Sequence, residues 1–319
     1  MRAMVCHHLS RDRSGPVFER DWAEPPPPGA GEVTVAMACA ALNYPDVLML
    51  SGGYQFAPPL PFVPGVEGSG TIVAVGEGVD PGVIGRAVIV GARFGCFAER
   101  LTLPVVATRG VPSGMDTADA AAFTVGALTA YVGLVRRGRL APGERVAVAG
   151  AGGGTGLAAI GIAKALGASV VALASDHAKL AAAREAGADE CVLVQRSAGV
   201  PALPLVDVVF DPVGGRLTTP LLASLRRGGR YLIIGFVGGI AEVRFDRLGE
   251  IEVIGVRAGE YARRDPAGGA ANISAIDALA EAGLAPHIGL RVPLAEAATA
   301  FAAMADGTLV GKAVIDCLA

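Results

Sequence analysis

The stretch of sequence that decides the fold runs from Arg145 to Leu173 and reads RVAVAGAGGGTGLAAIGIAKALGASVVAL. It begins as an apolar strand, passes through a glycine-dense turn, continues as a helix of small residues and ends in a second apolar strand. Glycines at such a turn let the backbone approach a pyrophosphate, whose charge is stabilised by the N–H groups at the helix N-terminus. Ala151 replaces the first glycine of the strict motif, but the elements follow in the right order and at the right lengths. The segment therefore predicts a dinucleotide-binding unit.

The composition sets limits on the size and the partners of the protein. A chain of 319 residues, 52% hydrophobic and 18% charged, is typical of a globular protein with about two domains. Its formal net charge of −3 gives no electrostatic support for binding nucleic acid or an anionic membrane surface. We therefore expect a small-molecule partner, with no nucleic acid and no membrane.

Three local features concern the location of the chain. The first ten residues carry Arg2 and two histidines with no apolar run behind them, so we expect no secretory signal and a cytoplasmic protein. The most apolar window, residues 150–175, is interrupted by Lys164 and is rich in glycine, which favours a buried core over a membrane span. The five cysteines are far apart and form no CxxC pair, so we expect reduced, buried thiols.

The pattern along the chain divides it into a β-rich part and an alternating part. Residues 1–123 consist of strands and turns, with Pro25–Pro28 as an extended connector, whereas residues 124–264 alternate strands with helices. The alternating part holds six apolar, mostly β-branched strands, which indicate burial on both faces: 146–149, 170–174, 191–194, 206–210, 231–234 and 253–256. This predicts an α/β protein with a doubly wound parallel six-stranded Rossmann sheet beside a mainly β domain.

Glycine stops and apolar periodicity predict the helices between and after these strands. We expect helices over 179–185, which ends at Gly187, and over 217–225, which ends at Gly228 and Gly229. The tail shows helices near 273–282 and 295–304 and a strand over 312–316, and we expect it to return to the first domain. The predicted domains are thus 1–123 with 265–319, and 124–264.

Several short strings in this order carry a resemblance to a known family. They are Asn43-Tyr44-Pro45-Asp46 with Gly52-Gly53-Tyr54, Pro64-Gly65-Val66-Glu67-Gly68-Ser69-Gly70, Leu128-Thr129-Ala130-Tyr131, Gly152-Gly153-Gly154-Thr155-Gly156, Asp211-Pro212-Val213-Gly214-Gly215, Gly229-Arg230-Tyr231 leading to Gly235, and Val310-Gly311-Lys312. Together they resemble the medium-chain dehydrogenase/reductase superfamily, and within it the zinc-free NADPH:quinone oxidoreductase family. The resemblance covers nearly the whole chain and implies a GroES-like catalytic domain beside the Rossmann domain.

The residues at the metal-ligand positions of this superfamily argue against zinc. The zinc-binding members place a cysteine where this chain has Asn43, a histidine where it has Val66 and a cysteine near Val125. Their four-cysteine lobe corresponds to 91–100, which holds only Cys96. A catalytic zinc site needs about three protein ligands, and Glu67 alone cannot supply them. We therefore expect no metal and no alcohol oxidation through a zinc alkoxide.

The residues after the second Rossmann strand favour NADPH as the cofactor. An NAD-binding fold places an acidic residue there to bind the ribose 2′-hydroxyl, and this chain has Ala174. Lys179 resembles the phosphate-binding lysine of the family, although Asp176 could reach the ribose and Val194 stands where relatives have a tyrosine. By resemblance the cofactor-binding residues are Tyr44, Leu48, Thr129, Tyr131, Gly152, Gly153, Gly154, Thr155, Ser175, Lys179, Gly235, Phe236 and Lys312.

Without a metal, the expected chemistry is direct hydride transfer from the nicotinamide to a quinone, in which alignment and exclusion of water matter most. Asn43 and Tyr54 are the candidates for catalytic residues, because both can donate a hydrogen bond to a carbonyl oxygen while uncharged. Each also has a structural interpretation, since Tyr54 could pack a loop and Asn43 could stabilise a turn.

Two other functions remain open on the sequence. The same hydride could reduce an α,β-unsaturated ketone or aldehyde, with Tyr54 or water as the proton donor. A non-catalytic NADPH-binding structural or regulatory protein is the third interpretation.

The strand over 249–255 should form a sheet edge, and superfamily members cover that edge with a second subunit, so we expect a homodimer.

Overall fold

The computed structural model describes residues 1–10, 15–195, 200–244, 246 and 248–319, and it divides into two compact units. Unit 1 comprises Met1–Thr124 and Ile288–Ala319, and unit 2 comprises Val125–His287. Residues 265–287 thus belong to the nucleotide-binding unit, whereas we expected this unit to end at 264. The helix over 266–281 lies there because its Asn272 accepts a 2.7 Å hydrogen bond from Nε of Arg136, which is also in unit 2.

Unit 2 is built on a parallel sheet, as predicted. In the part of unit 2 that the structure describes, the strands follow the order β10-β9-β8-β11-β12-β13, and every neighbouring pair is parallel. Their bounds are β8 Arg145–Ala149, β9 Ser169–Ala174, β10 Glu190–Leu193, β11 Val206–Asp211, β12 Leu225–Ile233 and β13 Glu252–Gly255. This is the doubly wound dinucleotide-binding order, and all six predicted strands are confirmed.

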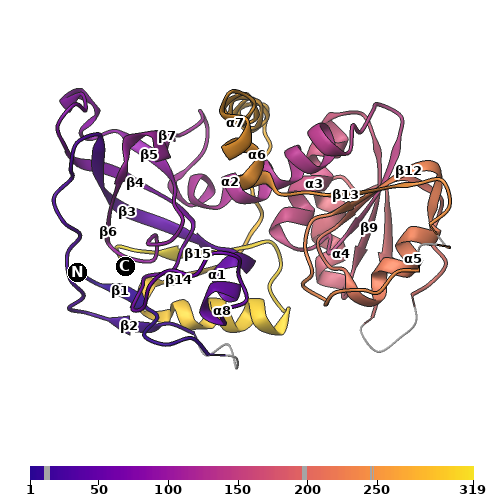
Figure 1. Ribbon diagram of the computed structural model, residues 1–319, viewed down its shortest axis with the longest axis horizontal. Helices are drawn as coiled ribbons and strands as arrows, with labels where there is room; N and C mark the ends of the chain where they lie inside the picture. Colours follow the sequence, from indigo (N-terminus) through magenta and orange to yellow (C-terminus); the bar gives the residue numbers. More distant parts are fainter. Residues whose placement is uncertain (11–14, 196–199, 245, 247) are drawn as a thin grey trace. The chain divides into compact units, whose positions relative to one another are not determined.

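Of the helical elements between residues 117 and 287, α3, α4 and α5 contact the strands of this sheet (Figure 1). The bounds of the helical elements are α2 Thr117–Tyr131, which begins in unit 1, then the π-helical turn η3 Val132–Arg137, α3 Gly154–Ala165, α4 His177–Glu185, η4 Gly215–Leu217, α5 Thr218–Ala223, α6 Ala258–Arg264 and α7 Pro266–Glu281. The predicted helix over 179–185 is confirmed within α4. The predicted helix over 217–225 is wrong at its end, because Leu225 already pairs with Val206 as the first residue of β12.

Unit 1 is mainly β. The two-stranded sheet β1-β2 and the larger sheet β14-β15-β3-β4-β5-β7, with β6 on β3, account for the strands that the structure describes there. Their bounds are β1 Ala3–Val5, β2 Val17–Glu19, β3 Glu32–Leu42, β4 Glu67–Val75, β5 Ala87–Gly91, β6 Arg100–Pro104, β7 Thr108–Gly110, β14 Ile288–Pro293 and β15 Lys312–Asp316. The helical elements are α1 Tyr44–Leu50, η1 Pro81–Val83, η2 Val105–Ala107, η6 Leu294–Glu296 and α8 Ala297–Asp306. The predicted strand over 312–316 is confirmed.

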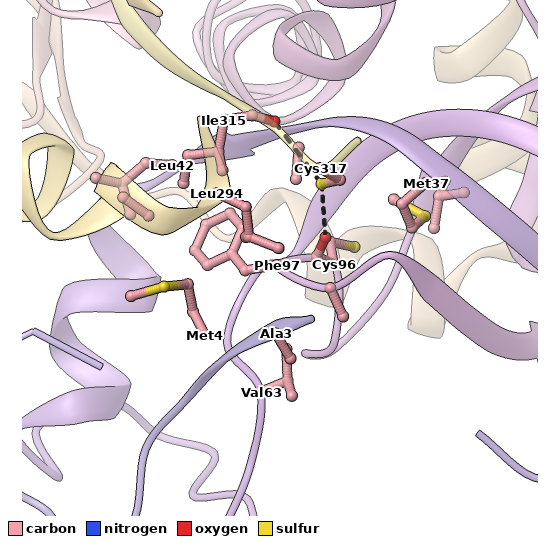
Figure 2. Packing of buried hydrophobic residues seen from close by; sticks show 14 of the residues in the cluster. Ala3, Met4, Met37, Leu42, Val63, Cys96, Phe97, Leu294, Ile315 and Cys317 are labelled. Atoms are coloured by element: carbon pink, nitrogen blue, oxygen red, sulfur yellow. Dashed lines mark hydrogen bonds between the residues drawn. The ribbon is translucent and has the colours of Figure 1, made fainter. Parts of the chain in front are cut away.

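The core of unit 1 joins the C-terminal tail to the N-terminal strands. Figure 2 shows Phe97 among apolar side chains from β1, β3, η6 and β15. The ring of Phe97 meets that of Phe301 of α8 edge to face, with 5.8 Å between their centroids. Cys317 donates weakly to the carbonyl oxygens of Cys96 and Ile315, and all five cysteines are free thiols, four of them buried. The tail is therefore part of the first unit through packing as well as through β15.

Among the described residues, one helical stretch, Thr117–Arg137, is long and apolar enough to cross a membrane by length and composition. In its most apolar window, 67% of the residues are buried inside the protein. Burial of this kind is typical of a core helix.

Candidate functional site

The glycine turn between β8 and α3 has the geometry of an anion-binding site. Gly153 precedes α3 with extended backbone angles, φ −87° and ψ 161°, and it has no side chain that could accept from the first N–H groups of the helix. The turn is held from within, since Gly153 N–H donates to the Gly150 carbonyl at 3.0 Å and Ala151 N–H donates to the Leu173 carbonyl at 3.0 Å. The N–H groups of the first helical turn, at Gly154 and Thr155, are therefore placed to bind an anion.

The spacing inside this turn requires glycine at two positions. A Cβ on Gly156 would lie 2.3 Å from the carbonyl oxygen of Gly150, and a Cβ on Gly152 would lie 2.3 Å from Cβ of Lys179. Both contacts are far shorter than van der Waals distance, so a side chain at either position would displace the turn. The cradle thus fits a pyrophosphate that approaches the bare backbone, as the sequence predicts.

At the carboxyl end of β9, a charged pair lies where the sequence places the ribose. The ammonium of Lys179 lies 3.0 Å from Oδ2 of Asp176 and donates a 3.2 Å hydrogen bond to Oγ of Ser175. Although partial burial acts in the opposite direction, the hydrogen bonds and the charge of Lys179 hold the pKa of Asp176 below its ordinary value. Ser175 and Lys179 thus lie together, and Asp176 contacts both side chains.

The loops after β11 and β12 are joined at the same edge of the sheet. Asp211 is 1% exposed, and its carboxylate accepts from the N–H groups of Val213 and Gly214, at 2.8 and 2.9 Å, and from the Tyr231 hydroxyl. Burial and the Asp211 charge raise the pKa of Tyr231 far above its ordinary value. This buried pair fixes the loop that leads to Gly235, whose N–H donates to the Asp211 carbonyl oxygen at 3.3 Å.

Phe236, a predicted cofactor residue, follows Gly235 and is 51% exposed.

A cation that the sequence did not single out lies near the carboxyl end of β9. The guanidinium of Arg216 donates to the carbonyl oxygens of Val194 and Gln195. Because Val194 N–H pairs with the Ala174 carbonyl, this guanidinium lies beside the strand that precedes Ser175. No local motif marks Arg216, since its partners are two backbone carbonyls about twenty residues earlier in the chain.

Thr129 and Tyr131 lie at the end of α2 and are both half-buried. The chain continues there as a π-helical turn, closed by a 2.7 Å hydrogen bond from Gly138 N–H to the Gly133 carbonyl. A Cβ on Gly133 would lie 2.9 Å from the Phe210 ring, and the Arg136 guanidinium lies 5.9 Å from the centroid of the Tyr131 ring. Single π-turns of this kind are frequent at functional sites.

In unit 1, the side chain of Lys312 is buried, and its ammonium is bonded to other groups of the protein. Its ammonium donates to Oδ1 of Asn43 at 2.7 Å, to Oε1 of Glu67 at 2.7 Å and to the Leu42 carbonyl at 3.2 Å. The side chains of Lys312 and Glu67 are only 6% and 1% exposed. Because three partners use the three N–H bonds of an ammonium, this geometry favours a structural role for Lys312 over the predicted contact with cofactor.

The same network occupies Asn43, a predicted catalytic donor. Its amide nitrogen donates to Oε1 of Glu67 at 3.0 Å and to the Ala41 carbonyl at 3.1 Å, which uses both amide hydrogens. Its side chain therefore positions the start of α1 and has no hydrogen left for a carbonyl acceptor. The sequence could not show this, because Lys312 is 269 residues away.

Asp46 joins two loops beneath this network. It is fully buried, and its carboxylate accepts from Asn43 N–H at 2.8 Å and from Gly65 N–H at 3.1 Å. Burial raises the pKa of Asp46 to about 7, against the opposing effect of these hydrogen bonds and of the Lys312 charge. The string Asn43-Tyr44-Pro45-Asp46 does not reveal this structural role of Asp46, because the burial of the carboxyl depends on the packing of residues far away in sequence.

Three predicted residues of unit 1 remain accessible. Tyr44 and Leu48 lie on α1 and are half-buried, and Tyr54 lies in the following loop with 37% of its surface exposed. The Tyr54 hydroxyl makes no hydrogen bond to another residue among those described. Of the two predicted catalytic residues, Tyr54 is thus the one whose donor is available.

The positions of zinc ligands in relatives have other roles here. Cys96 is fully buried in the core beside Phe97, and burial raises its pKa, which favours the neutral thiol over the thiolate. Within the ranges that the structure describes, no group of three or more His, Cys, Asp or Glu side chains could hold a metal ion.

Comparison with known proteins agrees with this architecture. Residues 29–134 match the alcohol dehydrogenase GroES-like domain, and residues 154–275 match the zinc-binding dehydrogenase family. Quinone oxidoreductase-like protein 2 of Rattus norvegicus is 32% identical over 325 residues, which covers 98% of this chain and 91% of that protein. The solved quinone oxidoreductase of Thermus thermophilus, described with its NADPH complex, is 32% identical with a TM-score of 0.83 and covers 99% of this chain and 100% of that chain.

A further relative is longer than this chain. The synaptic vesicle membrane protein VAT-1 homolog of Homo sapiens is 35% identical over 218 residues, which is 67% of this chain and 56% of that protein. The chain therefore spans about half the length of the VAT-1 homologs that it matches.

A GroES-like unit and a parallel dinucleotide-binding sheet in one chain define a protein of the medium-chain dehydrogenase/reductase class. Within this class, the chain belongs to the quinone oxidoreductase family of the medium-chain dehydrogenase/reductase superfamily.

Proposed function

We propose that the protein is a zinc-independent NADPH:quinone oxidoreductase. The observation that carries the proposal is the anion cradle at the N-terminus of α3, with Ser175 and Lys179 at the end of the neighbouring strand. Support comes from the quinone oxidoreductase-like relatives and from the solved NADPH complexes of similar proteins. When bound, the nicotinamide supplies the hydride; the chain supplies binding, orientation and exclusion of water.

The cofactor would be held by unit 2 through groups that are already in place. Gly152, Gly153, Gly154 and Thr155 would present backbone N–H groups to the pyrophosphate, and Ser175 and Lys179 would bind the 2′-phosphate. Gly235, Phe236, Thr129 and Tyr131 stay predictions as contacts of the nicotinamide half.

The acceptor would be oriented by side chains of unit 1. Tyr54 would donate a hydrogen bond to the acceptor carbonyl as negative charge develops on that oxygen, because its hydroxyl is partly exposed and makes no internal hydrogen bond to a described residue. Tyr44 and Leu48 would contact the ring of the acceptor or of the nicotinamide. Asn43 and Lys312 would act one step away, by fixing the first turn of α1.

The available Tyr54 hydroxyl also favours a second candidate function, the reduction of α,β-unsaturated ketones or aldehydes. In this reaction the hydride adds to the β-carbon and the α-carbon then needs a proton, which a tyrosine hydroxyl or water can deliver. Quinone reduction depends mainly on the orientation of the acceptor and on a hydrogen bond to its carbonyl oxygen, and it needs no proton on carbon. Loss of the Tyr54 hydroxyl should therefore impair the reduction of enones more than the reduction of quinones.

The experiment follows oxidation of NADPH by the purified protein with a benzoquinone, a naphthoquinone, an alkenal and an enone, and with NADP⁺ and alcohols in reverse. We expect turnover with quinones and none with alcohols. Turnover confined to enones, and lost in Tyr54→Phe, would favour the second function. Tight NADPH binding without oxidation by any acceptor would instead support a non-catalytic protein.

A further inference from the structure

Asp176 sits between the helix that it caps and the lysine expected to bind phosphate. Its Oδ1 accepts from the backbone N–H of Lys179 at 2.9 Å, while its Oδ2 lies 3.0 Å from the Lys179 ammonium. The hydroxyl of Ser175 donates to the same Oδ2 at 3.1 Å. One carboxylate therefore engages both side chains that would hold a 2′-phosphate.

Packing and capping limit how far either partner can move. The side chain of Lys179 is 11% exposed, and its stem lies against Gly152, where a Cβ would meet it at 2.3 Å. The carboxylate of Asp176 is the N-cap of α4, so a large rotation of this side chain would cost the helix its cap. A phosphate that approaches Lys179 would thus come close to a carboxylate that cannot easily withdraw.

We propose that Asp176 determines the nicotinamide-cofactor preference of this protein by competing with the 2′-phosphate of NADPH for Lys179 and Ser175. This inference rests on the proposed function, since it presumes that the end of β9 receives the adenosine ribose. NADPH brings a phosphate with close to two negative charges next to the carboxylate, whereas NADH brings a hydroxyl that can donate to it. Asp176 therefore weakens NADPH binding relative to NADH and brings the two affinities closer together.

The electrostatic environment supports this assignment. The side chain of Asp176 is 46% exposed, so water screens but does not abolish its repulsion of a phosphate. The hydrogen bonds of Lys179 keep the pKa of Asp176 below its ordinary value, so the carboxylate is charged at neutral pH. Among the residues that the structure describes, Arg216 is a second cation near the carboxyl ends of β9 and β10, where it donates to the carbonyl oxygens of Val194 and Gln195.

The test is calorimetric titration of NADPH and NADH into the full-length protein, without an acceptor, for the wild type and Asp176→Asn. Asparagine keeps a good N-cap but removes the charge. We expect NADPH to bind about three- to tenfold more tightly to the variant at low salt, while NADH binds equally or more weakly. The gain should shrink at high ionic strength. Asp176→Ser offers a second uncharged cap in case the first variant folds poorly.

Asp189→Asn is the matched control, because Asp189 also pairs with a lysine in unit 2 and accepts a backbone N–H bond, with 44% of its side chain exposed. We expect it to change neither affinity. Unchanged affinity ratios in both Asp176 variants, or an equal change in Asp189→Asn, would overturn the inference while leaving the proposed function intact. If the wild type bound neither nucleotide, both would fall.

Discussion

At the scale of single residues, Lys179 carries the prediction of a 2′-phosphate site. Lys179→Ala should raise the KM for NADPH about tenfold or more, because a charge-assisted hydrogen bond is lost, while the KM for NADH changes little. Steady-state kinetics with both cofactors measures this difference. Lys164→Ala removes a comparable ion pair with Asp189 elsewhere in unit 2 and serves as the control. Equal effects of Lys179→Ala on both cofactors would remove the assignment.

Asp46 gives a prediction about stability and pH. Burial raises its pKa in the folded protein to about 7, from an ordinary value of 3.8. The folded state therefore holds a proton that the unfolded state has already released, so the stability from this group is lost as pH rises toward 7. Between about pH 5 and about pH 7.5 the loss should be on the order of 2 kcal/mol.

Urea unfolding of the wild type and Asp46→Asn across this pH range measures the effect. The carboxyls with lowered pKa, such as Asp207 and Asp316, affect stability at lower pH and are common to both proteins. The stability of the wild type relative to the variant should fall with rising pH. A difference that stays constant over the range would show that Asp46 is ionised throughout.

At the scale of elements, the turn between β8 and α3 depends on a close backbone approach. Gly156→Ala should lower the free energy of unfolding by about 1–3 kcal/mol and weaken NADPH binding, since the new Cβ would lie 2.3 Å from the Gly150 carbonyl oxygen. Gly259→Ala in α6 is the control, because a Cβ there meets nothing within 4 Å and alanine favours the helix. Equal stability changes in the two variants would contradict this explanation.

Elements also show how far the sequence could predict the structure. The strands of the parallel sheet were predictable because burial on both faces leaves continuous β-branched runs, as in Val170–Ala174. The start of β12 was not predictable in this way, because Gly228 and Gly229 look like the stop of a helix. Arg226 and Arg227 instead pair with Asp207 and Glu250, beside the bulge in β12 that follows Leu225.

The candidate site likewise contains residues that the sequence could locate and residues whose roles it could not show. Gly152–Thr155, Ser175 and Lys179 lie within one strand–turn–helix unit and its neighbour, so the glycine motif and the family resemblance could point to them from the sequence. The roles of Asn43 and Lys312 depend on the pairing of β15 with β3, which brings together segments from opposite ends of the chain. Spacing along the chain contains no information about that contact.

At the scale of the whole molecule, the exposed edge of the parallel sheet predicts a homodimer. β13 is the last strand of its sheet, and Val253 is 47% exposed there. An apolar edge is protected when the same strand of a second copy pairs with it. Light scattering at micromolar concentration should give a dimer for the wild type and a monomer for Val253→Asp. A monomeric wild type would refute the prediction.

Our main proposal is that this molecule passes a hydride from NADPH to a conjugated carbonyl acceptor without a bound metal ion. The most direct test combines elemental analysis of the purified protein with quinone-dependent NADPH oxidation before and after treatment with a strong chelator. The account predicts far less than one metal per chain and the same turnover in both samples. Stoichiometric zinc, with turnover lost on its removal and restored on its return, would contradict it.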